Sequence, residues 1–398
     1  MKRRLIVGFL GVLAVALAAF FILGPGITER GMNRIDGEAL IEVSAEAKAL
    51  HETLDIVDLH SDTLLWKRSM LDGADRGHVD LPRLRRGNVA LQVFSSVTKT
   101  PRGQNYDANS ADTDNITTLV VAQAQPLRTW NSLLERSLFH ASKLEDAARE
   151  SDGALVKVAD AQTLGALMAA RATGGDRPVG ALFSAEGLHN LEGDAGNLDR
   201  LYAAGLRMAG LTHFFDNALA GSMHGMEKGG LTPLGRDVMR RMERMGIIVD
   251  IAHCSHRCVA QVLEMAQRPV VSSHGGVQAT CAVNRNLTDD EIRGVAATGG
   301  IIGVGYWDGA VCSTSPRATA RAMKHIRDLV GIEHVALGSD YDGAVTVRFD
   351  TSELTQVTQA LIDEGFSESE IRAAMGGNAL RVIGAGLVPL SEIEGRRQ

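Results

Sequence analysis

The chain has 398 residues, which is the length of two to three domains of about 150 residues, although a single α/β barrel reaches 250 residues or more. Hydrophobic residues make up 45% of the chain and charged residues 22%, ordinary globular values that exclude a disordered, a collagen-like or a coiled-coil protein. The net charge is −7, and no basic block lies beyond the extreme N-terminus, so the charge argues against nucleic acid as a partner.

The first element in chain order is an apolar segment. The basic residues of Met1 to Arg4 precede a run of uncharged, mostly apolar positions at 5–24. A helix of this length covers the roughly 30 Å hydrocarbon layer of a bilayer, and the basic cluster before it favours a cytoplasmic N-terminus. The segment is either a membrane anchor, the interpretation we favour, or a signal peptide cleaved near Ala16–Ala18. The remainder then lies on the extracytoplasmic side, anchored there or secreted or periplasmic after cleavage.

Beyond this segment, eight short apolar runs alternate with longer helical segments. Near-continuous apolar strands are typical of a parallel sheet buried on both faces. Eight such strands with alternating helices predict an α/β fold, a (β/α)8 barrel of the TIM type. An open doubly wound sheet is the alternative, but it needs a Gly-rich phosphate-binding turn that the first run lacks. The runs span residues 55–60, 89–95, 179–186, 206–213, 247–253, 269–274, 300–306 and 334–340.

Several connections between these runs carry signals of their own. The stretch between Ser95 and Val179 exceeds one crossover, so we expect a helical insertion between strands two and three. Thr232-Pro233 predicts the start of a helix that Gly246 ends, and a capping box of Ser367 and Glu370 predicts the start of another.

The carboxyl ends of the predicted strands carry the residues that indicate chemistry. These ends meet on one face of a barrel, where active sites are built. A lone histidine at a strand end is more often structural than a ligand, but so many groups together favour a site. Imidazole and carboxylate ligands suit Zn²⁺, and also Mn²⁺ or Fe²⁺. The groups are His60, Asp62, Glu186, His213, His253, His274 and Asp340.

These seven groups are too many for a single catalytic ion. A single catalytic zinc takes three protein ligands, whereas five ligands with a shared carboxylate fit two ions about 3.5 to 4 Å apart. We therefore expect His60 and Asp62 to hold one ion, His253 and His274 the other, and Glu186 to bridge them. His213 and Asp340 then remain for the substrate, and a water between the ions becomes a hydroxide nucleophile near neutral pH.

Two aspartates and the cysteines leave alternatives open. Asp58 could orient a ligating imidazole, and Asp342 could do the same or merely cap the following turn. The four cysteines support at most two disulfides in an oxidising compartment, and spacing alone does not give their pairing. Cys254 and Cys258 share a helix face, where we favour buried thiols over a metal site.

The motifs resemble those of the membrane (renal) dipeptidases, zinc metallopeptidases with an amidohydrolase-like barrel, from about His51 to Ala385. The similarity lies in the order of many motifs, from the first metal-binding segment to the last strand end. They are DLHSDTL, HVDLPRLRRGNVALQVFS, FSAEGLHNL, LTHFFDN, MERMGIIVDIAHCS, VVSSHGG, CAVNRNLTDDEI, ALGSDYDG and GGNALRVI.

This resemblance implies roles for individual residues. The family's metal ligands fall on the five positions already argued from the strand ends. Its substrate-binding histidine corresponds to His213, placed to donate to the developing oxyanion, and Arg285 corresponds to an arginine that grips the substrate carboxylate or the tetrahedral intermediate. Asp340 matches the aspartate near the substrate amine, a proton shuttle to the leaving nitrogen. Cys281 and Cys312 match a disulfide pair of the family.

Some family features have no counterpart in this chain. The cysteine that joins subunits of the mammalian enzyme is missing, so a homodimer, if formed, is not disulfide-linked. The mammalian relatives carry a C-terminal lipid anchor, whereas this chain ends in the polar EIEGRRQ. We therefore expect membrane contact, if any, through the N-terminal segment alone.

The expected protein is a zinc dipeptidase with two ions per chain that cleaves small-molecule dipeptides, including, as one option, those with a C-terminal D-residue. We divide it into a membrane anchor or signal peptide (1–30), a linker (31–45) and a metal-dependent dipeptidase barrel (46–398). One alternative is a binuclear amidohydrolase acting on another small amide or lactone. A second is a membrane-anchored binding protein on a catalytically dead barrel, but all five ligand positions are filled.

Overall fold

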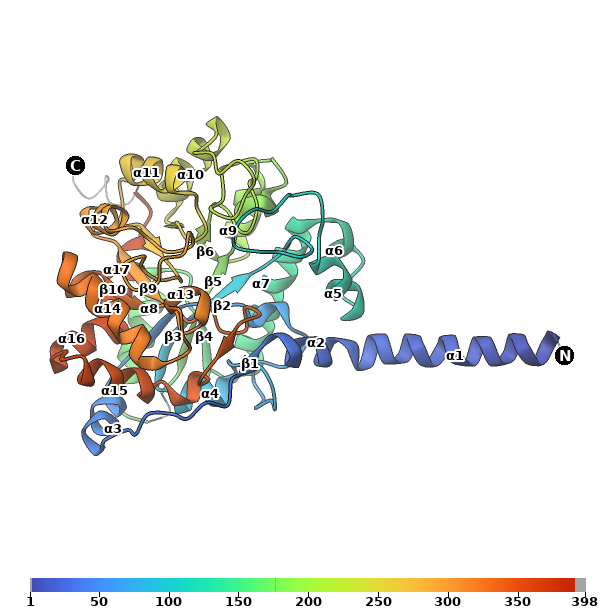
Figure 1. Cartoon of the computed structure of the whole chain (residues 1–398), viewed down its shortest axis with the longest axis horizontal. Helices are drawn as coiled ribbons and strands as arrows, with labels where there is room; N and C mark the ends of the chain where they lie inside the picture. Colours follow the sequence, from blue (N-terminus) through green and yellow to red (C-terminus); the bar gives the residue numbers. More distant parts are fainter. Residues whose placement is uncertain (1, 176, 391–398) are drawn as a thin grey trace.

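The computed structural model describes residues 2–175 and 177–390, so the C-terminal EIEGRRQ lies outside the described residues. At its centre, eight parallel strands form a ring surrounded by helices (Figure 1). In chain order these strands are β2 (Ile56–Ser61), β3 (Val89–Ser96), β5 (Val179–Ala185), β6 (Leu206–Gly210), β7 (Ile248–Asp250), β8 (Val271–Ser272), β9 (Ile301–Val304) and β10 (Val335–Leu337).

The hydrogen-bonded order of the strands shows that the ring is closed. The order runs β3-β2-β10-β9-β8-β7-β6-β5, and β3 pairs in parallel with β5 to complete it. The predicted TIM-type barrel is therefore confirmed, and each predicted apolar run contains one strand. A further strand that we did not predict, β4 (Leu155–Lys157), pairs with the first half of β5, while β6 pairs with the second half.

Helices follow the ring strands and form the outer layer. The predicted insertion between the second and third ring strands is confirmed, since α5 to α8 lie there together with β4. The helices are α3 (Ala45–Glu52), α4 (Leu81–Arg86), α5 (Ile116–Ala122), α6 (Arg128–Asn131), α7 (Leu133–Glu150), α8 (Ala161–Ala172), α9 (Asn197–Ala203), α10 (Pro233–Met245), α11 (His256–Met265), α12 (Asp289–Ala297), α13 (Asp308–Val311), α14 (Pro316–Val330), α15 (Thr355–Asp363), α16 (Glu368–Arg372) and α17 (Asn378–Gly386).

The two predicted helix starts are observed with their caps. The Thr232 side chain accepts a hydrogen bond from the Gly235 backbone at the start of α10, and Gly246 ends this helix with a φ of 76°. A left-handed backbone of this kind favours glycine because it has no Cβ. The capping box of Ser367 and Glu370 opens α16.

The interior of the ring is a packed apolar core. Every ring strand contributes to one cluster, through Val57, Leu91, Leu182, Met208, Ile248, Val271, Ile301 and Ala336. Helix α17 adds Val382 and Ile383 to this cluster, and its Gly386 approaches the side chain of Ile248, the first residue of β7. The amino ends of the strands are thus covered by α17, and the polar residues gather at the opposite, carboxyl ends.

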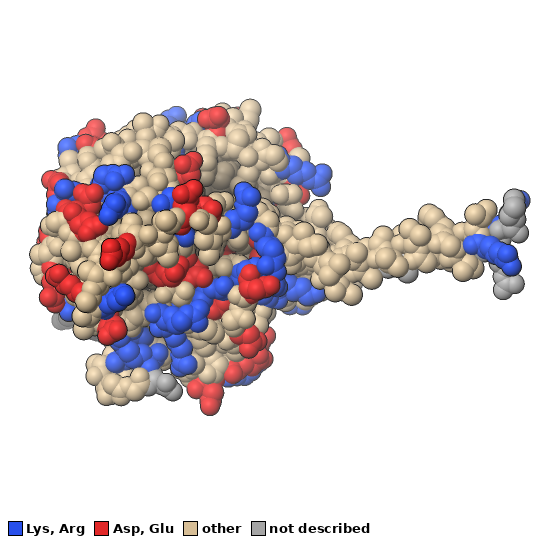
Figure 2. Space-filling view, turned by 60° about the horizontal axis from the view of Figure 1, so that its bottom comes forward, with Lys and Arg blue, Asp and Glu red and all other residues tan. Residues whose placement is uncertain are grey.

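The N-terminal segment forms two consecutive helices. Helix α1 (Lys2–Ile22) projects from the body as a rod with basic residues at its tip (Figures 1 and 2). Within it, Arg4–Ile22 is long and apolar enough to cross a membrane and is not buried against the body. Helix α2 (Gly24–Met32) follows and lies against the barrel, and β1 (Arg34–Ile35) then pairs with β11 (Thr346–Val347).

Candidate metal centre and substrate cleft

The seven predicted strand-end residues lie at one end of the barrel. His60 is the fifth residue of β2, while the others follow their strands directly or within three residues. Asp62 follows β2, Glu186 follows β5, and His274 lies two residues after β8. All seven side chains are buried.

Glu186 stands at the centre of this group. Its Oε1 atom lies 2.9 Å from His253 Nε2 and 3.2 Å from His274 Nε2. His60 Nε2 lies 3.6 Å from the same oxygen, and His60 Nε2 is 3.4 Å from Asp62 Oδ1. Ligands of a tetrahedral zinc ion lie about 3.4 Å from one another, because each bond is about 2.1 Å long. The spacing of these atoms therefore fits metal ligands.

The second oxygen of Glu186 faces a different residue. Its Oε2 atom lies 3.3 Å from His213 Nε2. His60, His253 and His274 thus converge on Oε1, with Oε2 turned toward the histidine that we expect at the substrate. Among the described residues, His60, Asp62 and Glu186 form one group with metal-ligand spacing, and Glu186 with His213 and His253 forms another.

Several polar atoms of the centre have no hydrogen-bond partner in the described part of the chain. They include His60 Nε2, Asp62 Oδ1 and Glu186 Oε2, all buried. A buried carboxylate or imidazole without a partner is costly, and bound cations are the usual partners of such atoms. The donor set of imidazole nitrogens and carboxylate oxygens is that of Zn²⁺, Mn²⁺ or Fe²⁺, so the residues fit a resident metal.

Burial dominates the electrostatics of the site. It raises the pKa of Glu186 well above the ordinary value, as does the neighbouring Asp62 carboxylate, while His60 opposes the shift. It also raises the pKa of Asp340 to about 7, with His60 lowering and Asp62 raising it. The pKa values of His213, His253 and His274 are held well below the usual range, chiefly by burial. Neutral imidazoles are the form that binds metal.

Asp250, the last residue of β7, is a part of the site that sequence reasoning missed. Its Oδ2 atom accepts a 2.5 Å hydrogen bond from Ser273 Oγ, which lies 2.8 Å from His274 Nδ1. Asp250 also forms a group of metal-ligand spacing with His60 and His274. The chain Asp250–Ser273–His274 fixes the orientation of the imidazole, as outer partners of metal ligands do. The Asp-x-x-His spacing before His253 was the available signal.

Asp58 and Asp342 have other roles than imidazole orientation. Asp58 Oδ1 accepts from the backbone N–H groups of His60 and Ser339, 3.0 and 3.2 Å away, so it ties the ends of β2 and β10 together. Asp342 accepts hydrogen bonds from Thr63 Oγ1 at 2.8 Å and from the His78 backbone at 2.6 Å. Both aspartates therefore shape the loops that carry the site.

Arg285 lies at the rim of the metal centre. Its Nη1 atom is 3.3 Å from His253 Nδ1, its guanidinium carbon lies 4.9 Å from the centre of the Trp307 ring, and Nη2 is 4.0 Å from Asp340 Oδ2. His213, Arg285 and Asp340 line one cleft of about 670 Å³ together with Asp62 and Glu186. A cleft of this volume lies in the usual range for small-molecule sites.

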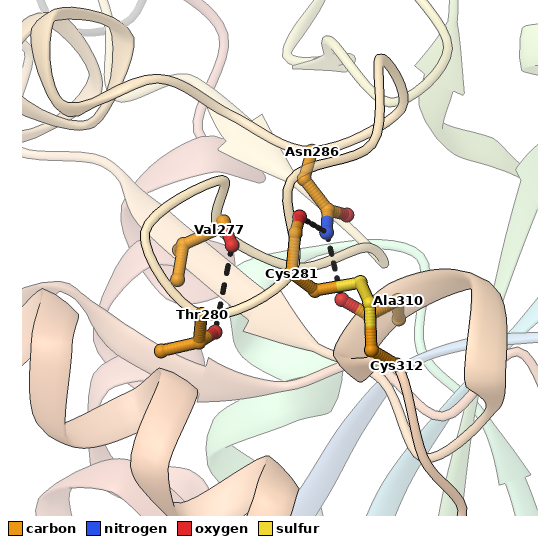
Figure 3. The surroundings of a disulfide bond; sticks show 6 residues. All are labelled: Val277, Thr280, Cys281, Asn286, Ala310 and Cys312. Carbon is orange, nitrogen blue, oxygen red and sulfur yellow. Dashed lines mark hydrogen bonds between the residues drawn. A yellow bond between two sulfur atoms is a disulfide. The ribbon is translucent and has the colours of Figure 1, made fainter.

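A disulfide joins Cys281 to Cys312 and fixes the loop that carries Arg285. Asn286, next to Arg285, donates from its side-chain amide to the Cys281 and Ala310 carbonyl oxygens, both 2.8 Å away (Figure 3). The loops after β8 and β9 are thus tied together beside the cleft. The two other cysteines, Cys254 and Cys258, are buried free thiols.

A closed parallel barrel with imidazoles and carboxylates at its carboxyl ends and a small-molecule cleft above them has the architecture of a metal-dependent hydrolase. The sequence matches the family model "Membrane dipeptidase (Peptidase family M19)" over residues 44–387. The chain therefore belongs to this family of metallopeptidases, which hydrolyse peptide bonds.

Individual relatives agree with this assignment. Dipeptidase aclJ of Aspergillus oryzae is 29% identical over 350 residues, covering 83% of this chain and 77% of its own. Dipeptidase verJ of Clonostachys rogersoniana is 27% identical over 355 residues, covering 85% and 86%.

Solved structures show the same fold. The probable dipeptidase PvdM from Pseudomonas aeruginosa has a TM-score of 0.71 at 20% identity and covers 86% of this chain and 98% of its own. A metallopeptidase from Rhodobacter sphaeroides, liganded with a phosphinate mimic of the dipeptide L-Ala-D-Ala, has a TM-score of 0.71 at 21% identity and covers 84% and 99%.

Proposed function

We propose that this metallopeptidase is a zinc dipeptidase that binds two ions per chain. His60 and Asp62 would hold one ion, His253 and His274 would hold the other, and Glu186 would be shared by both. The observation that carries the proposal is the convergence of three imidazoles, from His60, His253 and His274, on the single buried carboxylate of Glu186. Zinc held by these residues would activate water as the nucleophile near neutral pH and would polarise the scissile carbonyl.

The remaining groups act on the substrate. His213 donates a hydrogen bond to the oxygen that becomes negatively charged when the carbonyl is attacked. Arg285 binds the substrate carboxylate, and its guanidinium is buried between His253 and Trp307, where a charge-assisted hydrogen bond is strong. Asp340 faces the metal centre from the loop after β10 and passes a proton to the leaving amine.

We also propose where the enzyme works. The apolar part of α1 anchors the chain in a membrane, and residues 46–398, with the preceding α2 and β1 packed against them, form the catalytic domain on the extracytoplasmic side. The exposed apolar surface of α1 and the basic residues at its tip support this topology (Figure 2).

The test is metal content measured together with hydrolysis. The full chain, purified in detergent, is assayed for zinc per chain and for amino-acid release from a panel of L,L and L,D dipeptides. Dipeptides with a D-residue at the second position belong in the panel, because a structural neighbour binds an L-Ala-D-Ala mimic. We expect two zinc ions and cleavage. Two ions without cleavage of any dipeptide would instead indicate another small amide or lactone, and a metal-free chain would contradict the proposal.

A further inference from the structure

Helix α2 is built into the body of the barrel, although it directly follows the apolar segment. The Glu29 side chain is buried, and its Oε1 atom accepts a 2.5 Å hydrogen bond from Arg68 Nε. Its Oε2 atom accepts a 2.9 Å hydrogen bond from Arg76 Nε. Arg68 also donates to Asp342, which follows β10. A series of buried charged side chains, Glu29, Arg68 and Asp342, therefore connects α2 to the loop between β10 and β11.

A second set of contacts ties the end of α2 to the same loop. Asn33, which caps α2, accepts a 2.8 Å hydrogen bond from the Ala344 backbone through Oδ1. Directly beyond, β1 pairs with β11. Since Asp342 also accepts hydrogen bonds from Thr63 and from the His78 backbone, this loop is continuous with the residues that follow β2. The position of α2 is thus fixed relative to the metal centre.

One face of the N-terminal helices opens into the substrate cleft. Phe20, Gly24, Thr28 and Met32 line the same cleft as Asp62, Glu186 and His213. Their regular spacing of four residues puts them on one side of a helix, as a stripe that runs from the end of α1 along α2. Phe20, Thr28 and Met32 keep exposed surface because the cleft is open on this side, whereas Ile27 is exposed but lies off the stripe and does not line the cleft.

The part of the cleft near this stripe is uncharged and is lined by apolar side chains together with the polar Thr100, Gln104, Asn115 and Thr118. Its other lining residues include Leu65 after β2, Val97 after β3, and Ile116 and Leu119 of α5, which packs beside α2 (Figure 1). The charged groups, by contrast, belong to the metal centre and Arg285. A substrate whose peptide bond lies at the metal centre therefore has room for an apolar side chain directed toward α2, and burial of that side chain stabilises the complex.

We propose that α2 is a wall of the substrate cleft, fixed by the chain Glu29–Arg68–Asp342, and that the stripe Phe20, Gly24, Thr28 and Met32 selects dipeptides with a large apolar side chain. This inference rests on the proposed dipeptidase function. It makes Thr28 and Met32 specificity-determining residues and Glu29 a positioning residue, which acts on the substrate only through the placement of the helix.

The first test compares the same substitution at two adjacent positions of α2. Thr28→Trp puts a bulky side chain at the cleft, whereas Ile27→Trp puts it at a position of the helix that does not line the cleft. The full chain in lipid nanodiscs is assayed with alanine dipeptides and with dipeptides that have leucine or phenylalanine at either position. We expect Thr28→Trp to lower the ratio of kcat/KM for the large over the small substrate about tenfold, as pocket contacts of this size do. Ile27→Trp leaves the ratio at the wild-type value, and equal ratios in the two variants would overturn the stripe's role.

The second test addresses the buried charges that fix the helix. Glu29→Gln removes the ion pairs with Arg68 and Arg76, and Glu38→Gln makes the same change at an exposed glutamate. We expect Glu29→Gln to speed hydrogen exchange of the α2 amides and to raise KM for the large apolar substrate more than it lowers kcat. Exchange and KM equal to those of Glu38→Gln would overturn the positioning role.

The two proposals fail in different ways. If the wild-type chain cleaves no dipeptide, the proposed function is wrong, and hydrogen exchange still reports whether Glu29 fixes α2. If the wild-type chain cleaves dipeptides but Thr28→Trp and Ile27→Trp have the same specificity, the function stands and only the stripe's role is wrong.

Discussion

Two residues of the metal centre have backbone conformations that L-amino acids rarely adopt. His253 has a φ of 64° and Asp340 a φ of 58°, and both follow buried strands. Such a conformation costs about 1–3 kcal/mol and persists only where the surrounding structure enforces it. Here it aims an imidazole and a carboxylate into the same small volume, so part of the barrel's stability maintains the geometry of the site.

Glu186 and Asp62 give the most direct test of the metal centre. Glu186→Gln keeps the size of the side chain but removes the charge that faces four imidazoles, and Asp62→Asn does the same beside His60. We expect both variants to lose turnover by at least a hundredfold and to bind less metal, measured by steady-state kinetics and by metal analysis of the purified chain. Full activity in Glu186→Gln with both metals retained would contradict the central role of this carboxylate.

A substitution at Asp250 tests how His274 is oriented rather than which residues bind the metal. Asp250→Asn weakens the hydrogen bond to Ser273 and, through it, the orientation of His274. We expect metal affinity to fall about 10- to 100-fold while the fold is retained, as measured by titration with a chelator and by circular dichroism. Asp237→Asn, on the exposed surface of α10, is the control and should keep wild-type affinity. Equal affinities in the two variants would remove Asp250 from the site.

The sequence predicted which strand-end residues come together, because a parallel barrel brings all carboxyl ends to one face. It did not predict Asp250, since the Ser273 that links it to His274 comes from the neighbouring strand and the contact depends on register. Glu29 and Arg68 were not singled out either. Their partner Asp342 is far away in the chain, and a charged residue has no local pattern that reveals a distant ion pair.

At the scale of the elements, the disulfide between Cys281 and Cys312 joins the loops after β8 and β9. A closed loop of this length stabilises a fold by about 3 to 4 kcal/mol through the unfolded state. We expect the double variant Cys281→Ser, Cys312→Ser to lower the free energy of unfolding by an amount of this order, measured in urea, and to raise KM because Arg285 lies in the same loop. Reductant should lower the stability of the wild type but not that of the double variant, and the opposite pattern would contradict this role.

The contact between α3 and α15 makes the stability of the fold depend on pH. His51 of α3 is buried, its ring nitrogens lie 2.9 Å from Thr358 Oγ1 and 3.2 Å from the Gly87 carbonyl oxygen, and burial lowers its pKa to about 4. Between pH 6.5 and 4 the unfolded chain therefore binds a proton at this residue that the folded chain does not, so stability falls as the pH falls.

We expect His51→Gln to remove this part of the pH dependence. The free energy of unfolding, measured in urea from pH 7 to pH 4, should fall less steeply in the variant than in the wild type, by up to about 3 kcal/mol across the range. Burial also lowers the pKa values of His189 and His224 to about 3. Because both proteins contain these two residues, part of the slope of the free energy of unfolding against pH remains in each. Identical slopes would show that His51 does not contribute.

The sequence predicted the type of each element better than it predicted the residues at which the element begins and ends. The apolar runs gave the eight ring strands because strands buried on both faces have a continuous apolar sequence. The runs near residues 269–274 and 334–340 nevertheless contain strands of only two and three residues, β8 and β10, since the chain turns away once it reaches the site. Strand β4 is too short to form a pattern of its own, and its pairing with β5 depends on the tertiary fold.

On the scale of the whole molecule, membrane anchoring by α1 can be tested separately from catalysis by the barrel. If α1 anchors the chain, the protein should stay in the membrane pellet after a carbonate wash, and its intact mass should include the apolar segment. Removal of residues 2–22 should release the barrel without loss of its disulfide. A soluble wild-type protein that begins near residue 19 would instead show that the segment is a cleaved signal peptide.

The overall architecture followed from the count and spacing of the apolar runs. What the sequence did not reveal is that the segment before the barrel is part of it. Residues 24–40 have the glycine, proline and charge content of a linker, yet α2 is fixed by Glu29 and lines the cleft. Composition does not distinguish a free linker from a helix whose partners lie in distant parts of the chain, here Arg68, Arg76 and the Ala344 backbone.

The pairing of β1 with β11 has a consequence for how the chain is made. Residues 34 and 35 leave the ribosome early, but their partners at 346 and 347 are among the last to be synthesised. Glu29 can contact Arg68 soon after both are synthesised, whereas Asp342, the other charged partner of Arg68, is synthesised much later. The cleft wall is thus completed only when the two ends of the protein meet.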